Sequence, residues 1–493
     1  MTLLLLTLLV PLITAAAGAV GGPRQVKEAL LISGLVITFA LCLATAGAFL
    51  AGGPIEQFDA ALRVDGLSAL MLVLNGFAGL LSGIYGVGYL RRNEAGGRVT
   101  PRMRREFHAL VPAYLFALLL VCVSNNLGIL WIAVELTTLA SVFLVAFHNA
   151  ETSLEAAWKF LMLGSLGLGF ALLGTVLLFA AAQGRLGEGM AALNWTSFMA
   201  AAPGMHPFTL RLGVVFALIG YGTKAGLAPM HTWKPDAYRE APSSAGALMA
   251  VGMLNGAVYC LLRIHLISSA AVGPEFSSGL LLALGLLSVL VAVPFILIQW
   301  NLKRLLAYSS IEHVGIMAIG FGIGGEAGTF GALLHMTYHT FAKPIAFFSA
   351  GTLAQLHSSS NFETMGGGTI GRAPVSSVLL LLATVIITGS PPFGIFFSEM
   401  IILRAGFSSP HVLATAVLLA ALVVLFCGFA YQVGRLVLGP PPGDGVKFTP
   451  ETLDLCLVTA IVAAIIAVTV GFYMPNPLLD LIRAATLVTG GHS

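Results

Sequence analysis

Three ionisable side chains lie inside stretches of this sequence that are otherwise apolar. Glu135 stands in the segment Ile-Leu-Trp-Ile-Ala-Val-Glu-Leu-Thr-Thr-Leu-Ala-Ser, and Lys224 stands five residues before Pro229. Glu399 follows a Pro-Pro pair by seven or eight residues, which places it about 11 Å beyond a helix break. Since an unpaired charge in mid-bilayer costs roughly 3 kcal/mol or more, such residues are kept mainly where they have a partner or a function. They are candidates for an ion pathway.

A second set of ionisable residues is spaced to share one helical face. His335, His339 and Lys343 follow one another at intervals of four residues, which places them along about 12 Å of one side of a helix. Glu312 and His313 stand together in a neighbouring apolar stretch. Carboxylates, amines and imidazoles that pass from helix to helix can bind and release protons in turn. The pattern therefore favours a proton relay.

Each of these patterns also has a structural interpretation. Glu135 and Lys224 could form a static ion pair that fixes helix packing. His335 and His339 could bind zinc or haem, although a haem inside a membrane usually takes its histidines from two helices and no second helix offers an obvious partner. His313 could be an ordinary core histidine. We favour the relay and expect no metal and no cofactor on this chain.

The composition indicates which elements must position these residues. Of the 493 residues, 58% are apolar and only 9% are charged, which excludes an ordinary soluble protein. At about 20 residues per crossing, this apolar content suffices for about fourteen transmembrane helices. The net charge of +3 gives no indication of a nucleic-acid partner. The five cysteines stand singly in apolar runs, as core residues do.

The expected fold class is an all-α polytopic membrane protein that contacts the lipid bilayer. Apolar stretches predict fourteen spans, at 1–20, 28–52, 66–90, 108–125, 127–147, 158–182, 209–229, 242–268, 276–300, 304–324, 327–356, 375–404, 411–438 and 453–474. Proline interrupts the seventh and the twelfth, so both are expected to be broken helices. The more polar stretch 187–200 is expected to lie at the membrane interface.

The distribution of Lys and Arg predicts the orientation of the spans. If the loop between the third and fourth spans faces the cytoplasm, that side carries fifteen Lys and Arg residues, Lys447 among them, and the opposite side carries five. The cytoplasmic side of a membrane protein is normally the richer in these residues. With an even number of spans, both termini are expected outside the cytoplasm.

Three motifs carry a family resemblance. Residues 221–242, which read Tyr-Gly-Thr-Lys-Ala-Gly-Leu-Ala-Pro-Met-His-Thr-Trp-Lys-Pro-Asp-Ala-Tyr-Arg-Glu-Ala-Pro, closely resemble the signature of the proton-translocating antiporter-like subunits. These subunits belong to respiratory complex I, the Mrp-type cation/proton antiporters and the membrane-bound energy-converting hydrogenases. Residues 302–311 and 338–351 look like the second and third signatures of that family. The resemblance implies two inverted repeats of five helices, each with one broken helix.

The resemblance also implies roles for single residues. Glu135 looks like the family's glutamate in the fifth span, and Lys224 looks like the lysine paired with it. Glu399 occupies the position of a lysine or glutamate in the twelfth span, with Lys343 as a candidate partner. The expected proton pathway also takes in His231 of the first motif and Glu312, His313, His335 and His339.

Two residues depart from the family pattern. Asn255 stands where many members carry a lysine in the eighth span, so the central relay must run through histidines, water or Lys343, or be weaker. Lys234 replaces a residue that is usually apolar, and the sequence offers no account of it. The Asn255 variant, Glu312 with His313 and the segment Glu-Ala-Ala-Trp-Lys-Phe-Leu look most like component F of the hydrogenase-type branch.

The resemblance divides the chain into N-terminal helices at 1–107, a first repeat at 108–268, a second repeat at 276–438 and a C-terminal helix at 439–493. It implies a non-redox membrane subunit that moves protons in the inner (plasma) membrane of a prokaryote. The expected partners are other membrane subunits and a hydrophilic redox arm with iron–sulfur proteins. The alternatives are a subunit of a Mrp-type sodium/proton antiporter, a membrane partner of a zinc protein in inorganic-carbon uptake, and a structural anchor that has lost pumping.

Overall fold

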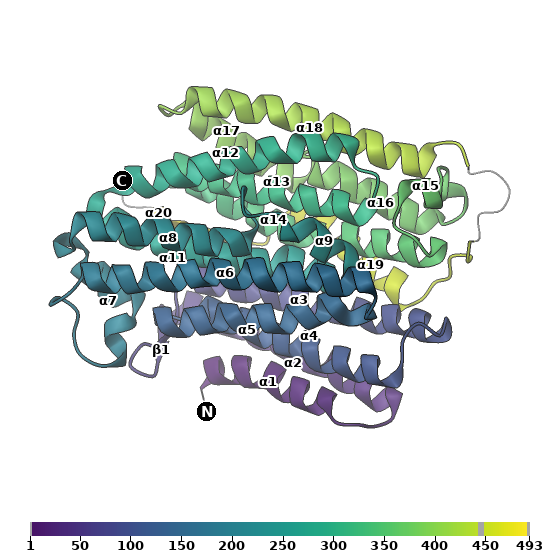
Figure 1. The fold of residues 1–493 in the computed structure, drawn as a ribbon, viewed down its shortest axis with the longest axis horizontal. Coiled ribbons are helices and arrows are strands. Elements are labelled where there is room, and N and C mark those ends of the chain that lie inside the picture. The colour runs from purple at the N-terminus through teal and green to yellow at the C-terminus, as the bar shows by residue number, and fades with distance from the viewer. Residues whose placement is uncertain (1, 442–447, 491–493) are drawn as a thin grey trace.

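The computed structural model describes residues 2–441 and 448–490 as a bundle of long helices that lie side by side (Figure 1). Within these residues, ten helical stretches are long and apolar enough to cross a membrane: α2 (Arg24–Gly52), α3 (Gly66–Ala95), α4 (Pro101–Val123), α5 with η1 (Leu127–His148), α6 (Glu151–Ala181), α10 through α11 (Ser243–Val272), α12 (Pro274–Ile298), α13 (Leu302–Ile323), α18 (Val412–Leu438) and α19 (Leu455–Phe472). The chain is therefore a multi-pass helical membrane protein, as the sequence predicts.

Of six further helices, five occupy the remaining expected spans and one, α9, lies between the seventh and the eighth. They are α1 (Leu3–Ala19), α8 (Pro207–Ala225), α9 (Trp233–Glu240), α14 (Gly325–His357), α16 (Pro374–Ile387) and α17 (Gly394–Phe407). Residues 226–232 separate α8 from α9, and residues 388–393 separate α16 from α17. Both interruptions contain the prolines from which breaks are expected, because proline lacks the amide hydrogen that would continue the helix.

The connections contain short elements. Residues 55–64 form a hairpin of β1 (Ile55–Gln57) and β2 (Leu62–Val64), in which Glu56 pairs with Arg63. The expected interfacial stretch 187–200 folds into η2 (Met190–Leu193) and the start of α7 (Trp195–Ala201), and η3 (Ala202–Gly204) follows. The other short elements are η1 (Ala146–His148), α15 (Phe362–Met365) and η5 (Thr369–Gly371). The crossing stretch Ser243–Val272 consists of α10 (Ser243–Leu248), η4 (Met249–Met253) and α11 (Leu254–Val272), and α20 (Asn476–Gly490) is the C-terminal helix.

Two helices begin seven residues before the positions that hydrophobicity predicts. α4 begins at Pro101 because Thr100 caps it, with its side chain accepting a hydrogen bond from the amide of Met103, and because proline suits the first helical position. α6 begins at Glu151, where a carboxylate suits the helix dipole. The charged residues at the starts of α4 and α6 are thus helical, although apolar content alone does not predict a helix there.

The helices differ in how much of their surface is covered. The most apolar part of Ser243–Val272 is completely buried, and that of Leu302–Ile323 is 94% buried, whereas that of α18 is 33% buried. Helices covered on every side form the core of the bundle, and sparsely covered ones present apolar side chains outward. Most of the ionisable residues of interest are buried between helices, whereas Glu135 on α5 is partly exposed.

The start of α1, α20, the β1–β2 hairpin and α7 all lie toward one end of the bundle, at the left in Figure 1. The loop between α3 and α4 lies at the opposite end, together with α15. Lys447, counted among the cytoplasmic cations, lies outside the described residues. Four cysteines are buried as expected, but Cys427 is exposed on α18 and is not a core residue.

Candidate functional site

Lys224 lies at the end of α8, beside the first interruption. It is buried, and its Nζ donates a hydrogen bond to Oγ1 of Thr138 on α5 at 2.8 Å. The ring of Phe160 on α6 covers it, with 5.0 Å between Nζ and the ring centroid. Two neighbouring helices therefore hold a lysine amine away from water.

Glu135 stands one helical turn before Thr138 on α5. Its charge lies near enough to act on Lys224, yet no salt bridge joins the two residues. The carboxylate oxygen Oε2 of Glu135 is buried and has no hydrogen-bond partner among the described residues. The glutamate and the lysine are therefore neighbours that form no direct ion pair, and the lysine is hydrogen-bonded to Thr138 instead.

The interruption between α8 and α9 leaves main-chain groups that side chains must satisfy. Gly226 has φ +77, a left-handed conformation that suits glycine, and ends α8. The indole Nε1 of Trp233 donates to the carbonyl of Thr223 at 2.9 Å. The amide of Ala228 donates to Oγ of Ser288 on α12 at 2.9 Å. The break is thus held in a defined geometry by side chains from both sides.

Lys234, for which the family motif offers no role, serves the same interruption. It is 1% exposed, and its Nζ donates to the carbonyl oxygen of Ala225 at 2.7 Å. Ala225 is the residue next to Lys224, so two buried amines approach the same helix end. The charge of Lys234 also acts on His339 and Lys343 of α14. Lys234 therefore contacts the end of α8 and is near enough to the ionisable face of α14 for its charge to act there.

His335, His339 and Lys343 are fully buried on α14. The ring of His335 is hydrogen-bonded on both sides, by Nε2 to Nδ1 of His313 at 2.9 Å and by Nδ1 to Oγ of Ser398 at 3.0 Å. The ring of His339 lies 4.9 Å from that of His313, and both of its nitrogens lack hydrogen-bond partners in the part of the chain that the structure describes. One face of α14 thus connects α13 with α17.

The surroundings of Lys343 repeat those of Lys224. The Nζ of Lys343 donates to Oγ of Ser309 on α13 at 2.8 Å. Glu312 stands one turn after Ser309, is 5% exposed, and lies near enough for its charge to act on Lys343. Each lysine therefore has a hydroxyl acceptor on a neighbouring helix and a carboxylate one turn away on that same helix.

Glu399 lies on α17, and its carboxylate touches the second interruption. A Cβ added at Gly389 would come 2.1 Å from Oε2 of Glu399. The expected separation of about 11 Å is therefore wrong, because α17 begins only at Gly394 and helical side chains lean toward the N-terminus of their helix. The charge that acts most on Glu399 is that of Glu312. Glu312 is thus near both Glu399 and Lys343, the partner considered for Glu399.

Asn255 stands where the family pattern has a lysine. Its Nδ2 donates to Oδ1 of Asn75 on α3 at 3.2 Å and to Oγ1 of Thr340 on α14 at 3.1 Å. The preceding residues 249–253 form a single π-helical turn, a distortion that often accompanies functional sites. His231 lies in the first interruption, 8% exposed, with a buried Nδ1 that has no partner among the described residues.

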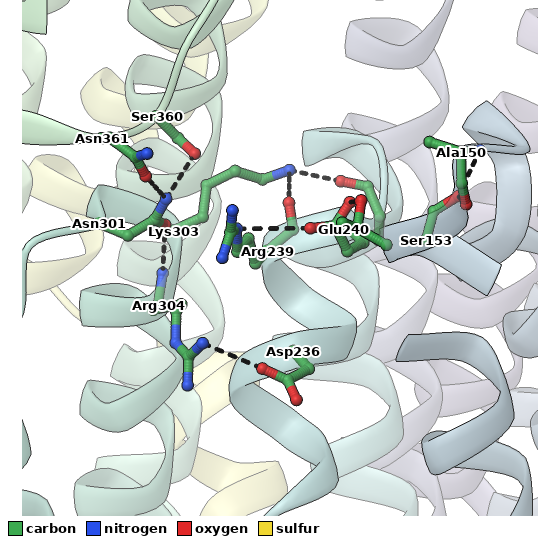
Figure 2. Close-up of polar contacts among 12 residues, drawn as sticks. Ala150, Ser153, Asp236, Arg239, Glu240, Asn301, Lys303, Arg304, Ser360 and Asn361 are labelled. Atoms are coloured by element: carbon green, nitrogen blue, oxygen red, sulfur yellow. Dashed lines mark hydrogen bonds and ion pairs between the residues drawn. The ribbon is translucent and has the colours of Figure 1, made fainter. Parts of the chain in front are cut away.

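A cluster of charged side chains joins α9 to the start of α13 (Figure 2). The Nζ of Lys303 donates to the main-chain carbonyls of Arg239 and Ala241, both at 2.6 Å. Arg304 pairs with Asp236 at 3.1 Å. Because α9 follows the first interruption and α13 carries Glu312, these contacts fix the two ionisable regions relative to each other.

Sequence reasoning missed a buried ion pair. Nη2 of Arg263 on α11 lies 2.7 Å from Oδ1 of Asp65, which caps α3. The guanidinium of Arg263 lies over the rings of Trp195 and Tyr259, at 4.2 and 4.6 Å from their centroids. Both charges stand at the edges of apolar stretches, and only the fold brings together residues that are 198 positions apart.

The comparison with family models assigns the chain to a class. The model described as "NADH:quinone oxidoreductase/Mrp antiporter, TM" matches residues 124–424, which include both interruptions and every residue of the expected pathway. The chain belongs to this family, and it is an antiporter-like membrane subunit of the type found in complex I, hydrogenases and Mrp systems.

Individual relatives make the placement more specific. The chain is 36% identical over 381 residues to the hydrogenase-4 component F homolog of Methylacidiphilum infernorum (isolate V4), covering 77% of this chain and 80% of that protein. A chain of the Mrp complex from Dietzia sp. DQ12-45-1b has the same fold, with a TM-score of 0.85 at 17% identity over 99% and 98% of the two chains. A chain of the archaeal membrane-bound sulfane sulfur reductase has a TM-score of 0.84 at 23% identity over the same shares.

Proposed function

We propose that this chain moves protons across the membrane as a non-redox subunit of a complex driven by electron transfer. The observation that carries the proposal is the hydrogen-bonded row from His313 through His335 to Ser398, which is fully buried and ends beside Glu399. Imidazoles that share a hydrogen bond can pass a proton by exchanging donor and acceptor roles. A row of this kind suits transport better than simple packing, because apolar residues would pack without the cost of burying polar groups.

The proposed route begins at Glu135 and Lys224 and ends at Glu399. Between them we place Lys234, His339 and the row on α14, with Glu312 and Lys343 as a neighbouring acid–base pair. Some side-chain atoms of Glu135, Asn255 and His339 have no hydrogen-bond partner among the described residues. Water molecules at these atoms would complete the route. His231 stands beside the route, at the first interruption.

Lys234 fills the place left by the lysine that is absent at position 255. Its amine approaches the end of α8 through the carbonyl of Ala225, and its charge acts on His339. We infer that the central step of the relay passes through α9 and that Asn255 holds α3, α11 and α14 together. The main argument for a structural anchor that has lost pumping is the absence of a lysine at position 255. That argument no longer applies if Lys234 takes the role of this lysine.

The finer topology belongs to the same proposal. We assign fourteen crossings, with inverted repeats at 108–268 and 276–438, and both termini on the side away from the cytoplasm. The parts 1–107 and 439–493 flank the repeats, although residues 1, 442–447 and 491–493 lie outside the described residues. Two observations support this topology. Helices are present at all fourteen expected spans, and Lys and Arg cluster at the end of the bundle opposite to the termini.

The assignment to a redox-driven complex rests on the relative named as a hydrogenase-4 component F homolog. We propose that other membrane subunits flank this chain and that iron–sulfur proteins of a hydrophilic arm carry the electrons. The chain itself would hold no cofactor, and the complex would lie in the inner membrane of a prokaryote.

Substitutions of Glu399 test the route within the intact complex. In vesicles that hold the purified complex, electron donor is added and proton movement is followed with a pH-sensitive dye. Glu399→Gln should reduce proton movement about a hundredfold, whereas Glu399→Lys, which still titrates, should keep part of it. Glu155→Gln, which removes a side chain that is 61% exposed and pairs with Lys159, should have no effect. Equal and near-normal transport by both Glu399 variants would contradict the route.

A subunit of a Mrp-type sodium/proton antiporter is the second candidate. It is favoured by the TM-score of 0.85 to a chain of a Mrp complex. A sodium gradient that drives proton movement in vesicles without an electron donor would support this candidate. Proton movement that requires the electron donor would support the first.

A further inference from the structure

A cationic pocket lies between α1, α2 and the start of α4, away from the proposed route. It encloses about 240 Å³, and four of its lining side chains are basic: Lys27, Arg102, Arg104 and Arg105. No carboxylate lines it. The loop between α3 and α4 closes the same end of the bundle, which the distribution of Lys and Arg assigns to the cytoplasm.

Two of these four cations are balanced by carboxylates outside the pocket. Arg102 pairs with Glu106 at 2.8 Å, and Arg104 pairs with Glu94 at 2.7 Å. Lys27 donates to the carbonyl of Ala17. Among the described residues, neither Lys27 nor Arg105 makes a salt bridge. The pocket therefore carries an excess of positive charge that this chain leaves without a counter-charge.

The position of the arginines makes this excess unusual. Arg102, Arg104 and Arg105 stand in the first two turns of α4, at the end where a helix dipole is positive. Basic residues there oppose the dipole, whereas an anion is stabilised by it. This arrangement favours a bound anion.

A buried histidine supplies a second, independent observation. His108 lines the pocket, is 1% exposed, and its Nε2 has no hydrogen-bond partner among the described residues. Glu28, Arg104 and Lys27 are near enough for their charges to act on its ring. Glu28 is already paired with Arg24 at 2.8 Å and Arg91 at 2.5 Å, so it does not neutralise the pocket. An oxyanion would serve as the partner that His108 lacks.

We propose that this pocket binds the phosphate group of an anionic phospholipid of the cytoplasmic leaflet. The lipid source is favoured over free phosphate because apolar side chains at the pocket and on α2 are exposed among the described residues. Val20 lines it and is 65% exposed, and Val26 and Leu30 of α2 are 51% and 43% exposed. A headgroup held by the cations would place its acyl chains along α2, in the arrangement by which basic pockets between helices bind anionic lipids.

Lipid binding by the purified complex tests the proposal. Native mass spectrometry would measure phosphatidylglycerol and phosphatidylcholine bound to the native complex and to Lys27→Gln/Arg105→Gln. The control is Arg98→Gln/Arg435→Gln, which removes the same charge from the same end of the bundle outside this pocket. Phosphatidylglycerol should bind in preference to phosphatidylcholine, and its affinity should fall roughly thirtyfold in the pocket variant only.

The same measurement separates the two sources of phosphate. Inorganic phosphate at millimolar concentration should leave the bound phosphatidylglycerol in place if the acyl chains contribute to binding. Displacement by phosphate would overturn the lipid assignment in favour of a free anion. Equal binding of the two lipids, or equal loss in the pocket and control variants, would overturn the site. The measured quantity is the amount of lipid bound per complex. The lipid site can therefore be confirmed or rejected whether or not the chain transports protons.

Discussion

Each buried lysine on the proposed route has an uncharged acceptor. Lys224 donates to a threonine hydroxyl, Lys343 to a serine hydroxyl, and Lys234 to a main-chain carbonyl. These acceptors can receive a hydrogen bond from an ammonium group and from a neutral amine alike. A lysine held in this way keeps its position when it loses a proton, which a static salt bridge would not allow at the same cost. The side-chain chemistry is therefore suited to repeated titration.

Lys234 provides the sharpest prediction at the scale of single residues. Lys234→Met should keep the volume of the buried side chain, remove the titrating group, and lower electron-driven proton movement about a hundredfold. Lys234→Arg keeps the charge and the hydrogen bond to the carbonyl of Ala225 but does not release its proton. It should therefore fold as the native chain does and still fail to transport. Initial rates in vesicles measure both effects.

A second substitution separates relay from helix capping. If Lys234 replaces the lysine absent at position 255, then Asn255→Lys in the Lys234→Met background should restore part of the transport. Normal transport by Lys234→Arg would show that the residue only caps α8.

The buried pair of Asp65 and Arg263 carries a prediction about stability. Asp65→Asn would leave the Arg263 guanidinium, which is fully buried, without its counter-charge. The free energy of unfolding should fall by about 3 to 5 kcal/mol. This fall would be measured as a lower midpoint of thermal unfolding in detergent. Asp480→Asn, which removes an exposed carboxylate 3.6 Å from Arg483, should change the midpoint little. Equal midpoints for the two variants would contradict a structural role for the buried pair.

Some of these residues can be found from the sequence and others cannot. Glu135, Lys224 and Glu399 stand out because a charge in an apolar stretch is rare and expensive. Lys234 stands out as an anomaly, but its role depends on a hydrogen bond to a helix end that only the fold reveals. The partnership of Asp65 with Arg263 depends on packing between distant parts of the chain, which no local pattern records.

At the scale of elements, the interrupted helices decide where the ionisable groups meet. α8 ends beside Lys224, and α17 begins close enough to the second interruption for Glu399 to touch Gly389. Interrupted helices in a membrane leave polar main-chain groups that can bind water or ions. Each half of the proposed route therefore has one carboxylate or amine at such a point.

Gly389→Ala tests the contact at the second interruption. The added Cβ would meet the Glu399 carboxylate at 2.1 Å, and Gly389 also has φ +68. We expect the carboxylate to be displaced and proton movement to fall at least tenfold, with assembly of the complex retained. The change is measured as the transport rate relative to the amount of assembled complex.

Gly325→Ala is the matched control. Gly325 has φ +64, but an added Cβ would meet nothing within 4 Å. The Gly325→Ala variant therefore has the same backbone strain of a left-handed alanine, about 1 kcal/mol, but no contact between the added Cβ and a carboxylate. Equal transport by the two variants would show that the position of Glu399 does not depend on the interruption.

The sequence predicts the elements better than their ends. Apolar stretches and prolines locate the spans and both interruptions, because hydrophobicity and the missing proline amide act locally. Charged turns at the starts of α4 and α6 are missed, since they are helical but not apolar. The helix α20 is also missed, because only one face of it is buried, with Leu478, Leu481 and Ile482 packed inward.

At the scale of the whole molecule, the covered helices form a polar interior inside an apolar bundle. α3, α11 and α14 are joined there by Asn75, Asn255 and Thr340, and α13 is joined to α14 through His313 and His335. The proposed route runs along this interior from one interruption to the other, parallel to the membrane. A long lateral route of this kind could pass a change at one end of the subunit to the other, which is what coupling to a partner arm requires.

The ratio of protons moved to electrons transferred tests the central claim most directly. It is measured in vesicles that hold the complete complex, native or with Lys224→Met, by recording dye response and donor oxidation together. If this chain moves protons while its partners carry out the redox chemistry, Lys224→Met should lower the ratio by the share of this subunit and leave assembly and the bound iron–sulfur centres unchanged. An assembled Lys224→Met complex with the native ratio would contradict the account.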